Sequence, residues 1–430
     1  MCSLLFLRLH AIMSNMTYTE TLQYIHSLTR FGIKPGLERV SALCAALGNP
    51  QEKLRFIHVA GTNGKGSTCT MLAEICKAAG MKTGLYTSPY VIDFRERMQA
   101  GGTMIPKDDL VRLTALVREK ADALPDPVTE FEFITALAFL WFDEQKCDVV
   151  VLEVGLGGRL DATNVIPPPL TSVITKIAYD HMDVLGNTLT LIAGEKCGII
   201  KPTSPVVTTC EQGNEALEVI KNTAKERNCN LTVPTQNQCV ILNSSITGTE
   251  AVLDGLPVHV PLLGDHMVRN ALTAVATARQ LNIPGKAIQA GIAAARIPAR
   301  MELLSQDPLI LLDGGHNPDC ARALAHALSK HLPTQKLCAI CGMMADKDVA
   351  QYLQILKPHI SRIIAVQPNN PRALSAAELA AQAKQLGYEK TTPAASLKEA
   401  LQAAEYPLLI CGSFYLAGEV RAYLSSSAYC

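Results

Sequence analysis

The 430-residue chain is longer than one hydrophobic core usually supports, so two domains are expected. Hydrophobic residues make up 48% and charged residues 18% of it, which is typical of a well-packed globular protein and excludes a disordered one. Lysine plus arginine and aspartate plus glutamate both number 39, so no excess charge points to nucleic acid or to an anionic membrane as a partner.

Residues 1–15 are apolar but short, and they include Arg8 and His10. They lack a charged start followed by an uninterrupted apolar core and a small-residue cleavage site, so we expect an N-terminal tail, not a signal peptide. Met13 and Met16 are alternative starts. No stretch approaches the roughly 20 apolar residues of a membrane span, and we expect a cytoplasmic protein.

The 14 cysteines are scattered along the chain, which favours reduced thiols over a disulfide framework. Cys338 and Cys341 have the spacing of a redox or zinc pair. They lie in an apolar strand pattern with no second pair nearby, so buried strand cysteines are the favoured interpretation.

In chain order, two helices are predicted over 19–30 and 36–47, followed by an apolar strand over 56–60. The next residues are Gly61, Thr62, Asn63, Gly64, Lys65, Gly66 and Ser67, and a helical pattern covers 70–79. Strand, glycine loop and helix in this order favour a phosphate site, because backbone N–H groups and the helix N-terminus converge on one anion. Lys65 adds a full positive charge, although Gly66 departs from the standard G-x-x-x-x-G-K-[ST] spacing. We predict a nucleoside triphosphate site; an ordinary glycine-rich turn is the alternative.

Uninterrupted apolar strands then alternate with helices, which predicts a mainly parallel sheet covered on both faces. The strands are expected over 82–86, 148–153, 170–177 and 205–209, and the helices over 107–123, 130–142, 190–200 and 213–227. Residues 231–263 predict a small antiparallel excursion, and helices follow over 267–280 and 286–295.

A second alternation of strands and helices begins after a candidate hinge at 297–300. We therefore predict an α/β protein whose ATP-binding domain covers 16–297 and whose smaller Rossmann-like domain covers 298–430.

Polar side chains follow three predicted strands of the first domain: Ser88, Glu153 and the Asp180-His181 pair. Ligands bind at the carboxyl edge of a parallel sheet, so these side chains are candidates for a nucleotide site, with Glu153 facing Mg²⁺. Histidine is a less typical Mg²⁺ ligand, so His181 by itself is more often a hydrogen-bonding residue, and ordinary polar caps of strands are the alternative for all of them. Glu195 and Lys196 lie in a predicted helix and, from their spacing alone, are surface residues. The turn from Gly155 to Asp161 either holds a substrate carboxylate or reverses the chain.

In the second domain, a strand ends in Asp313-Gly314-Gly315-His316, which favours another edge-of-sheet site.

Together these motifs resemble the Mur ligase superfamily, and within it the folylpolyglutamate synthase/dihydrofolate synthase family. The resemblance runs from about Tyr18 to Tyr423. Its motifs are the loop 58–67, Tyr86-Thr-Ser-Pro89, the segment 153–164, Asp180-His181, Leu185-Gly186, the segment 195–201, Asp313–Pro318 and Gly412–Leu416.

The resemblance implies an ATP-dependent amide ligase of folate biosynthesis and one-carbon metabolism. A folate carboxylate takes the γ-phosphoryl group, and L-glutamate attacks the acyl phosphate; dihydropteroate is a second possible acceptor. A monomer that acts on small molecules is expected. The alternatives are another Mur-type amide ligase, which would carry a further N-terminal domain, and a non-catalytic nucleotide switch.

The resemblance also implies roles for single residues. The triphosphate loop is Gly61 to Ser67, and Asn270, Arg300 and Asp313 match nucleotide contacts. Mg²⁺ ligands match Ser88, Glu153 and His181, with Lys196 carbamylated as an anionic ligand of a second Mg²⁺. Lys65, His181, Lys196 and His316 are the expected catalytic residues, and pterin contacts are expected near 27–30 and 129–131. This chain has Ala299 where relatives often have glycine, Tyr90 where they have histidine, and Gly315 where they have alanine.

Overall fold

The computed structural model describes residues 16–32 and 34–427, so the expected tail at 1–15 lies outside the described residues. Contacts between α-carbons divide the chain into two compact units. The first contains the described residues up to Tyr90, together with Arg95–Thr235 and Thr273–Gly291. The second contains Val91–Phe94, Gln236–Leu272 and the described residues from Ile292 onward. Each unit is described below by itself.

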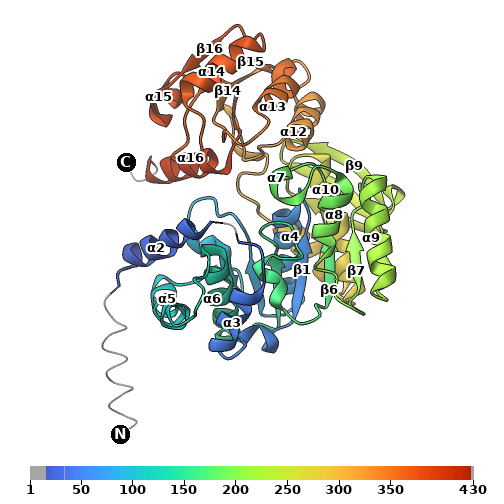
Figure 1. The fold of residues 1–430 in the computed structure, drawn as a ribbon. Coiled ribbons are helices and arrows are strands. Elements are labelled where there is room, and N and C mark those ends of the chain that lie inside the picture. The colour runs from blue at the N-terminus through green and yellow to red at the C-terminus, as the bar shows by residue number, and fades with distance from the viewer. Residues whose placement is uncertain (1–15, 33, 428–430) are drawn as a thin grey trace. The chain divides into compact units, whose positions relative to one another are not determined.

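The first unit is built on an eight-stranded sheet of order β4-β3-β2-β5-β1-β6-β7-β8. Figure 1 labels its strands β1, β6 and β7. Its strands are β1 (Phe56–Ala60), β2 (Thr83–Tyr86), β3 (Met98–Ala100), β4 (Thr103–Met104), β5 (Val149–Glu153), β6 (Thr171–Ile174), β7 (Val206–Thr208) and β8 (Leu231–Thr232). The neighbouring strands in the part β2-β5-β1-β6-β7-β8 all pair parallel. Strand β3 pairs antiparallel with both β2 and β4, and the sequence predicted neither β3 nor β4. The prediction of a mainly parallel sheet is confirmed.

Helices cover this sheet because their apolar side chains recur at helical spacing. They are α2 (Tyr18–Ser27), α3 (Glu38–Ala46), α4 (Lys65–Ala78), α5 (Lys107–Asp122), α6 (Glu130–Glu144), α7 (Met182–Leu185), α8 (Leu189–Cys197), α9 (Asn214–Glu226) and most of α11 (Gly285–Ala294). The Thr129 hydroxyl and the Glu132 carboxylate cap the start of α6 reciprocally, and Phe139 of α6 packs edge-on against Phe56 with ring centroids 5.6 Å apart.

The second unit contains two sheets. The small antiparallel one, of order β11-β10-β9, comprises β9 (Cys239–Ser245), β10 (Gly248–Leu253) and β11 (Leu256–Val260), which confirms the predicted antiparallel excursion. The larger one has the order β12-β13-β17-β14-β15-β16 and comprises β12 (Glu302–Gln306), β13 (Leu309–Asp313), β14 (Leu337–Cys341), β15 (Ile360–Ala365), β16 (Thr391–Pro393) and β17 (Leu408–Cys411). β12 pairs antiparallel with β13 at the sheet edge, and neither β12 nor β16 was predicted.

Both faces of the larger sheet are buried, because successive side chains of a strand point to opposite faces. Leu337, Ala339 and Cys341 lie in one apolar cluster, whereas Cys338 and Ile340 lie in the other. The helices are α12 (Pro318–His331), α13 (Val349–Leu356), α14 (Ala376–Gln385), α15 (Leu397–Gln402) and α16 (Phe414–Ser427), and α10 (Asp265–Gln280) is shared between the units. The interpretation of Cys338 and Cys341 as buried strand cysteines is confirmed.

Short 3₁₀ turns connect several of these elements; they are η1 (Leu28–Phe31), η2 (Pro50–Lys53), η3 (Phe94–Arg97), η4 (Ala162–Val165), η5 (Gln236–Gln238) and η6 (Lys357–His359). Within the described ranges, none of the helices combines the length and the apolar character needed to cross a membrane.

Helix α11 approaches α4 so closely that only glycine fits at position 291. A Cβ atom there would lie 2.4 Å from the backbone N and Cα of Ile75. We expect Gly291→Ala to destabilise the protein by about 1–3 kcal/mol, because a backbone segment has to move. Gly194→Ala in α8 is the matched control, since a Cβ there meets no atom within 4 Å. That change should stabilise by about 0.5–1 kcal/mol. Thermal unfolding of both variants measures this; equal melting temperatures would contradict the close approach.

Candidate active site

The loop after β1 has a conformation that glycine makes possible. Gly61 has φ 152° and its missing Cβ would lie 1.8 Å from Thr175 Oγ1, and Gly64 has φ 87° at the start of α4. The backbone N–H groups of Thr62 and Asn63 donate to the carbonyl oxygen of Lys176, at 2.9 and 3.1 Å. The segment after β6 therefore holds the loop, and this is why β6 ends at Ile174 and not at the predicted residue 177.

Lys65 begins helix α4, and its Nζ donates to the carbonyl oxygens of Gly61, at 3.1 Å, and Thr62, at 3.3 Å. Ser67 and Thr68 are buried in the first turn of the same helix. A helix N-terminus with an adjacent ammonium group favours an anion, because unpaired backbone N–H groups and a full positive charge point the same way.

Lys196 reaches the same loop from α8. Its side chain is 4% exposed and its Nζ donates to the carbonyl oxygen of Gly61 at 2.9 Å. The interpretation of Lys196 as a surface residue is therefore wrong, because helical spacing alone does not reveal which side of α8 is covered. Burial and the nearby Lys65 ammonium lower the pKa of Lys196 to about 7.

The glycine turn after β5 covers α8. A Cβ on Gly158 would lie 2.7 Å from the carbonyl oxygen of Glu195, and one on Gly198 would lie 2.3 Å from Arg159 Cα. Arg159 also pairs with the carboxylate of Glu195 at 2.8 Å. The two backbones can touch only because both positions are glycine, and this contact encloses Lys196.

Asp161 organises that turn from inside. Its buried carboxylate accepts hydrogen bonds from the backbone N–H of Leu156, at 2.8 Å, and from the N–H and hydroxyl of Thr163, at 3.0 and 2.5 Å. Burial raises the pKa of Asp161, while these hydrogen bonds act in the opposite direction. These contacts stabilise the reversal of the chain, and binding of a substrate carboxylate by the turn stays a prediction.

Glu153, at the end of β5, lies beneath the first turn of α4. Its side chain is 4% exposed, and its Oε2 accepts a hydrogen bond from the backbone N–H of Ser88 at 3.0 Å. A Cβ on Gly66 would lie 3.4 Å from the same oxygen. A buried carboxylate beside a phosphate loop suits Mg²⁺, which takes oxygen ligands and shares them with phosphate. In the described part of the chain, no group of three or more His, Cys, Asp or Glu side chains is suited to a metal ion.

His181 follows β6 and is the N-cap residue of α7, with φ 50°. Its backbone N–H donates to Asp180 Oδ1 at 3.0 Å, and its side chain is 46% exposed. His181 thus lies in the segment that follows β6, with an exposed side chain.

The two segments expected to contact a pterin lie together. His26, at the end of α2, contacts the Glu130 carboxylate at 3.0 Å, just before Ser27–Arg30. The ring of Phe131 packs on Gly155, where a Cβ would lie 2.5 Å from Phe131 Cζ. The Arg97 guanidinium lies over the ring of Tyr90, with Cζ 5.3 Å from the ring centroid.

The second unit has its own group of candidate residues after β13. The buried Asp313 carboxylate accepts from the backbone N–H groups of Met301 and Gly315, both at 3.0 Å. Arg300 stacks on the Phe414 ring, with Cζ 4.0 Å from its centroid, and the His316 ring meets the same ring edge-on at 5.9 Å. Phe414 was not predicted as a site residue; its place in the Gly412–Leu416 motif was the available signal. Asn270 is half-buried on α10.

The pKa of Lys196 predicts a pH-dependent stability. Because the folded value of about 7 lies below the ordinary 10.5, the unfolded chain binds more protons between these values, so the free energy of unfolding rises with pH across this window. Lys196→Met should therefore be more stable than the parent protein below pH 7, with a difference that shrinks towards pH 10.5. Urea unfolding across this range measures the difference. Lys221→Met, at an exposed lysine of α9, should show no such trend, and a pH-independent difference for Lys196→Met would contradict the burial.

Two family models match the chain: the Mur ligase middle domain over residues 59–278 and the Mur ligase, glutamate ligase domain over residues 299–413. The chain is 39% identical to folylpolyglutamate synthase of Lacticaseibacillus casei, over 94% of this chain and 98% of that protein. It is 35% identical to dihydrofolate synthase/folylpolyglutamate synthase of Bacillus subtilis, over the same shares of both chains.

The fold is likewise similar to solved structures. Mycobacterium tuberculosis folylpolyglutamate synthase with ADP superposes with a TM-score of 0.86, at 31% identity over 94% of this chain and 98% of the other. An FPGS–AMPPCP–folate complex has a TM-score of 0.83, at 38% identity over 95% of this chain and all of the other. On its sequence, its two α/β units and these similarities, the chain belongs to the folylpolyglutamate synthase/dihydrofolate synthase family of Mur ligases.

Proposed function

We propose that this protein is an ATP-dependent ligase that adds L-glutamate to the γ-carboxylate of tetrahydrofolates and releases ADP and phosphate. The observation that carries the proposal is the convergence of Lys65 and Lys196 on the Gly61 carbonyl, beside the buried Glu153 carboxylate. The Lys65 ammonium and the N-terminus of α4 suit a triphosphate, and the related FPGS structure contains AMPPCP and folate. Dihydropteroate is proposed as a second acceptor, in line with the bifunctional relative.

The reaction has two steps. A carboxylate oxygen of the acceptor attacks the γ-phosphorus of ATP, ADP departs, and an acyl phosphate forms. The amino nitrogen of L-glutamate then attacks the acyl carbon, loses a proton and displaces phosphate. Lys65 and the first turn of α4, from Gly64 to Ser67, neutralise the charge that spreads over the phosphoryl oxygens. Gly61, Thr62 and Asn63 hold the loop in the required shape.

The proposed Mg²⁺ ligands are Ser88, Glu153 and His181, with Lys196 at a second site. Mg²⁺ would supply positive charge next to the transferred phosphoryl group. An ammonium group repels such an ion, so Lys196 requires conversion to a carbamate. With a pKa of about 7, a large share of Lys196 is the neutral amine near pH 7. Its nitrogen can attack CO₂ and release a proton, which leaves an anionic carbamate.

We also propose that Asn270, Arg300 and Asp313 contact the nucleotide and that His316 takes part in catalysis. The clustering of Arg300, Asp313 and His316 around Phe414 and Gly314 supports their action as one group. The proposed domains are 16–297 for ATP binding and 298–430 for glutamate ligation, supported by the matched ranges 59–278 and 299–413. The protein is proposed to act as a monomer.

The first test is phosphate release by the purified protein with ATP, Mg²⁺ and L-glutamate. We expect release that requires both L-glutamate and tetrahydrofolate, because the acyl phosphate is consumed only by the amine. Release with dihydropteroate as well would identify a bifunctional synthase. Lys65→Ala, which removes the charge at the phosphate loop, is the negative control. No release with either acceptor would contradict the proposal and favour another Mur-type ligase or a nucleotide switch.

Lys196→Ala tests the carbamate. We expect the activity to fall by about 100-fold or more, because the variant lacks the proposed anionic ligand of the second Mg²⁺ and with it positive charge near the reacting phosphate. With ¹³C-bicarbonate, the parent protein should show a carbamate carbon signal by NMR that is absent in this variant. Lys221→Ala, on the exposed side of α9, should keep both the signal and the activity. Near-normal turnover of Lys196→Ala would rule out the assigned role.

A further inference from the structure

The turn that carries Arg300 has two residues in a conformation that side chains disfavour. Ala299 has φ 57° and Met301 has φ 43°, although neither is glycine, and both are buried. Left-handed backbone of this kind persists only where surrounding contacts enforce it. Neither alanine nor methionine has the freedom of glycine at positive φ, so the turn depends on those contacts.

Carboxylates on the following two strands hold both of these residues. The Met301 N–H donates to Asp313 Oδ1 at 3.0 Å, and the Ala299 N–H donates to Glu302 Oε2 at 2.9 Å. The carbonyl oxygen of Ala299 also accepts from the N–H of Gly314 at 2.7 Å. The residue before Arg300 and the residue after it are thus fixed by separate acidic side chains.

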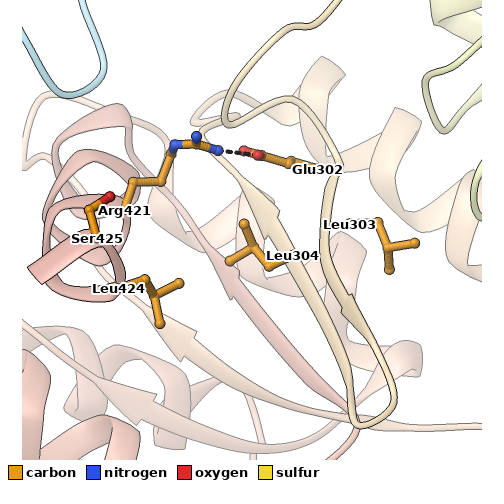
Figure 2. Close-up of a pocket in the computed structure, with 6 residues that line it drawn as sticks. All are labelled: Glu302, Leu303, Leu304, Arg421, Leu424 and Ser425. Atoms are coloured by element: carbon orange, nitrogen blue, oxygen red, sulfur yellow. Dashed lines mark hydrogen bonds and ion pairs between the residues drawn. The ribbon is translucent and has the colours of Figure 1, made fainter. Parts of the chain in front are cut away.

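Glu302 is itself held by Arg421 of α16. The Arg421 Nη1 donates to the second carboxylate oxygen, Glu302 Oε1, while Oε2 remains engaged with Ala299 (Figure 2). The pair lies in a surface hollow of about 250 Å³, which Leu303, Leu304, Leu424 and Ser425 also line. The side chains of Arg421 and Glu302 are 28% and 24% exposed. Ion pairs in contact with water contribute little to global stability, so the main effect of this one is expected to be local.

Arg421 and Arg300 are linked through one helix. Phe414, whose ring lies 4.0 Å from the Arg300 guanidinium carbon, is the first residue of α16, two turns before Arg421. Helix α16 therefore contacts the turn twice: Phe414 stacks on the side chain of Arg300, and Arg421 holds its backbone through Glu302.

We propose that Glu302 and Arg421 are positioning residues that keep Ala299 in its left-handed conformation and so aim Arg300 at the nucleotide. The proposal rests on the proposed role of Arg300. The ion pair is expected to affect the affinity for ATP. It is not expected to affect the rate of the chemical step, which depends on the residues around Gly61.

The experiment compares Glu302→Ala, Arg421→Gln and the double variant in the full-length protein. We expect each single variant to raise KM for ATP by about fivefold with kcat within about twofold. The KM of the double variant should rise no further than that of a single variant, because both changes break the same ion pair. Titration with AMPPCP should show the same loss of affinity. Glu405→Gln, which removes an ion pair with Arg362 elsewhere in the second unit, is the matched control and should leave KM unchanged.

Rescue separates positioning from a general loss of stability. Because glycine adopts positive φ readily, Ala299→Gly added to Glu302→Ala should restore most of the ATP affinity. An unchanged KM in Glu302→Ala, or no rescue by glycine, would overturn the positioning role. Arg300→Ala distinguishes the two proposals. If it weakens ATP binding while Glu302→Ala does not, only the positioning role fails; if it has no effect, the role of Arg300 and the inference both fail.

Discussion

One carbonyl oxygen, that of Gly61, accepts hydrogen bonds from two lysine ammonium groups, Lys65 at 3.1 Å and Lys196 at 2.9 Å. Burial of Lys196, and in second place the nearby Lys65 ammonium group, lower the pKa of Lys196 to about 7. An anion at the loop would relieve the repulsion between the two ammonium groups, and so would conversion of the Lys196 amine to an anionic group. The arrangement is therefore suited to an anionic group at the loop.

That arrangement requires close backbone approaches on both sides of the loop. Gly61 lies against Thr175, and the carbonyl oxygen of Lys176 holds the N–H groups of the next two loop residues. On the other side, Gly158 and Gly198 let the turn after β5 touch α8, and Asp161 satisfies the N–H groups within that turn. Gly61, Gly158 and Gly198 thus allow the backbone segments around the loop to pack closely.

In the second unit, carboxylates stabilise the turn that carries a candidate site residue. The residue directly before Arg300 is alanine and not glycine. Glu302 accepts from the Ala299 N–H, and Asp313 accepts from the Met301 N–H. Asp313 is buried and the pKa of its carboxyl is raised by that burial, although two backbone N–H groups and Arg300 favour its charged form. A residue predicted as a nucleotide contact thus also has a structural role within the unit.

The sequence by itself determined the α/β class, the parallel order of strands and helices, the phosphate loop and the family, because apolar periodicity and glycine-rich motifs are local signals. It missed β3, β4, β12 and β16, which are short or lie at sheet edges where few apolar residues mark them. It placed Lys196 on the surface because a helix pattern does not show what covers the helix. Only the tertiary structure decided that Lys196 is buried where the turn after β5 meets α8. It also decided that Glu302 accepts from the Ala299 N–H and pairs with Arg421, since these contacts depend on how distant segments of the chain pack.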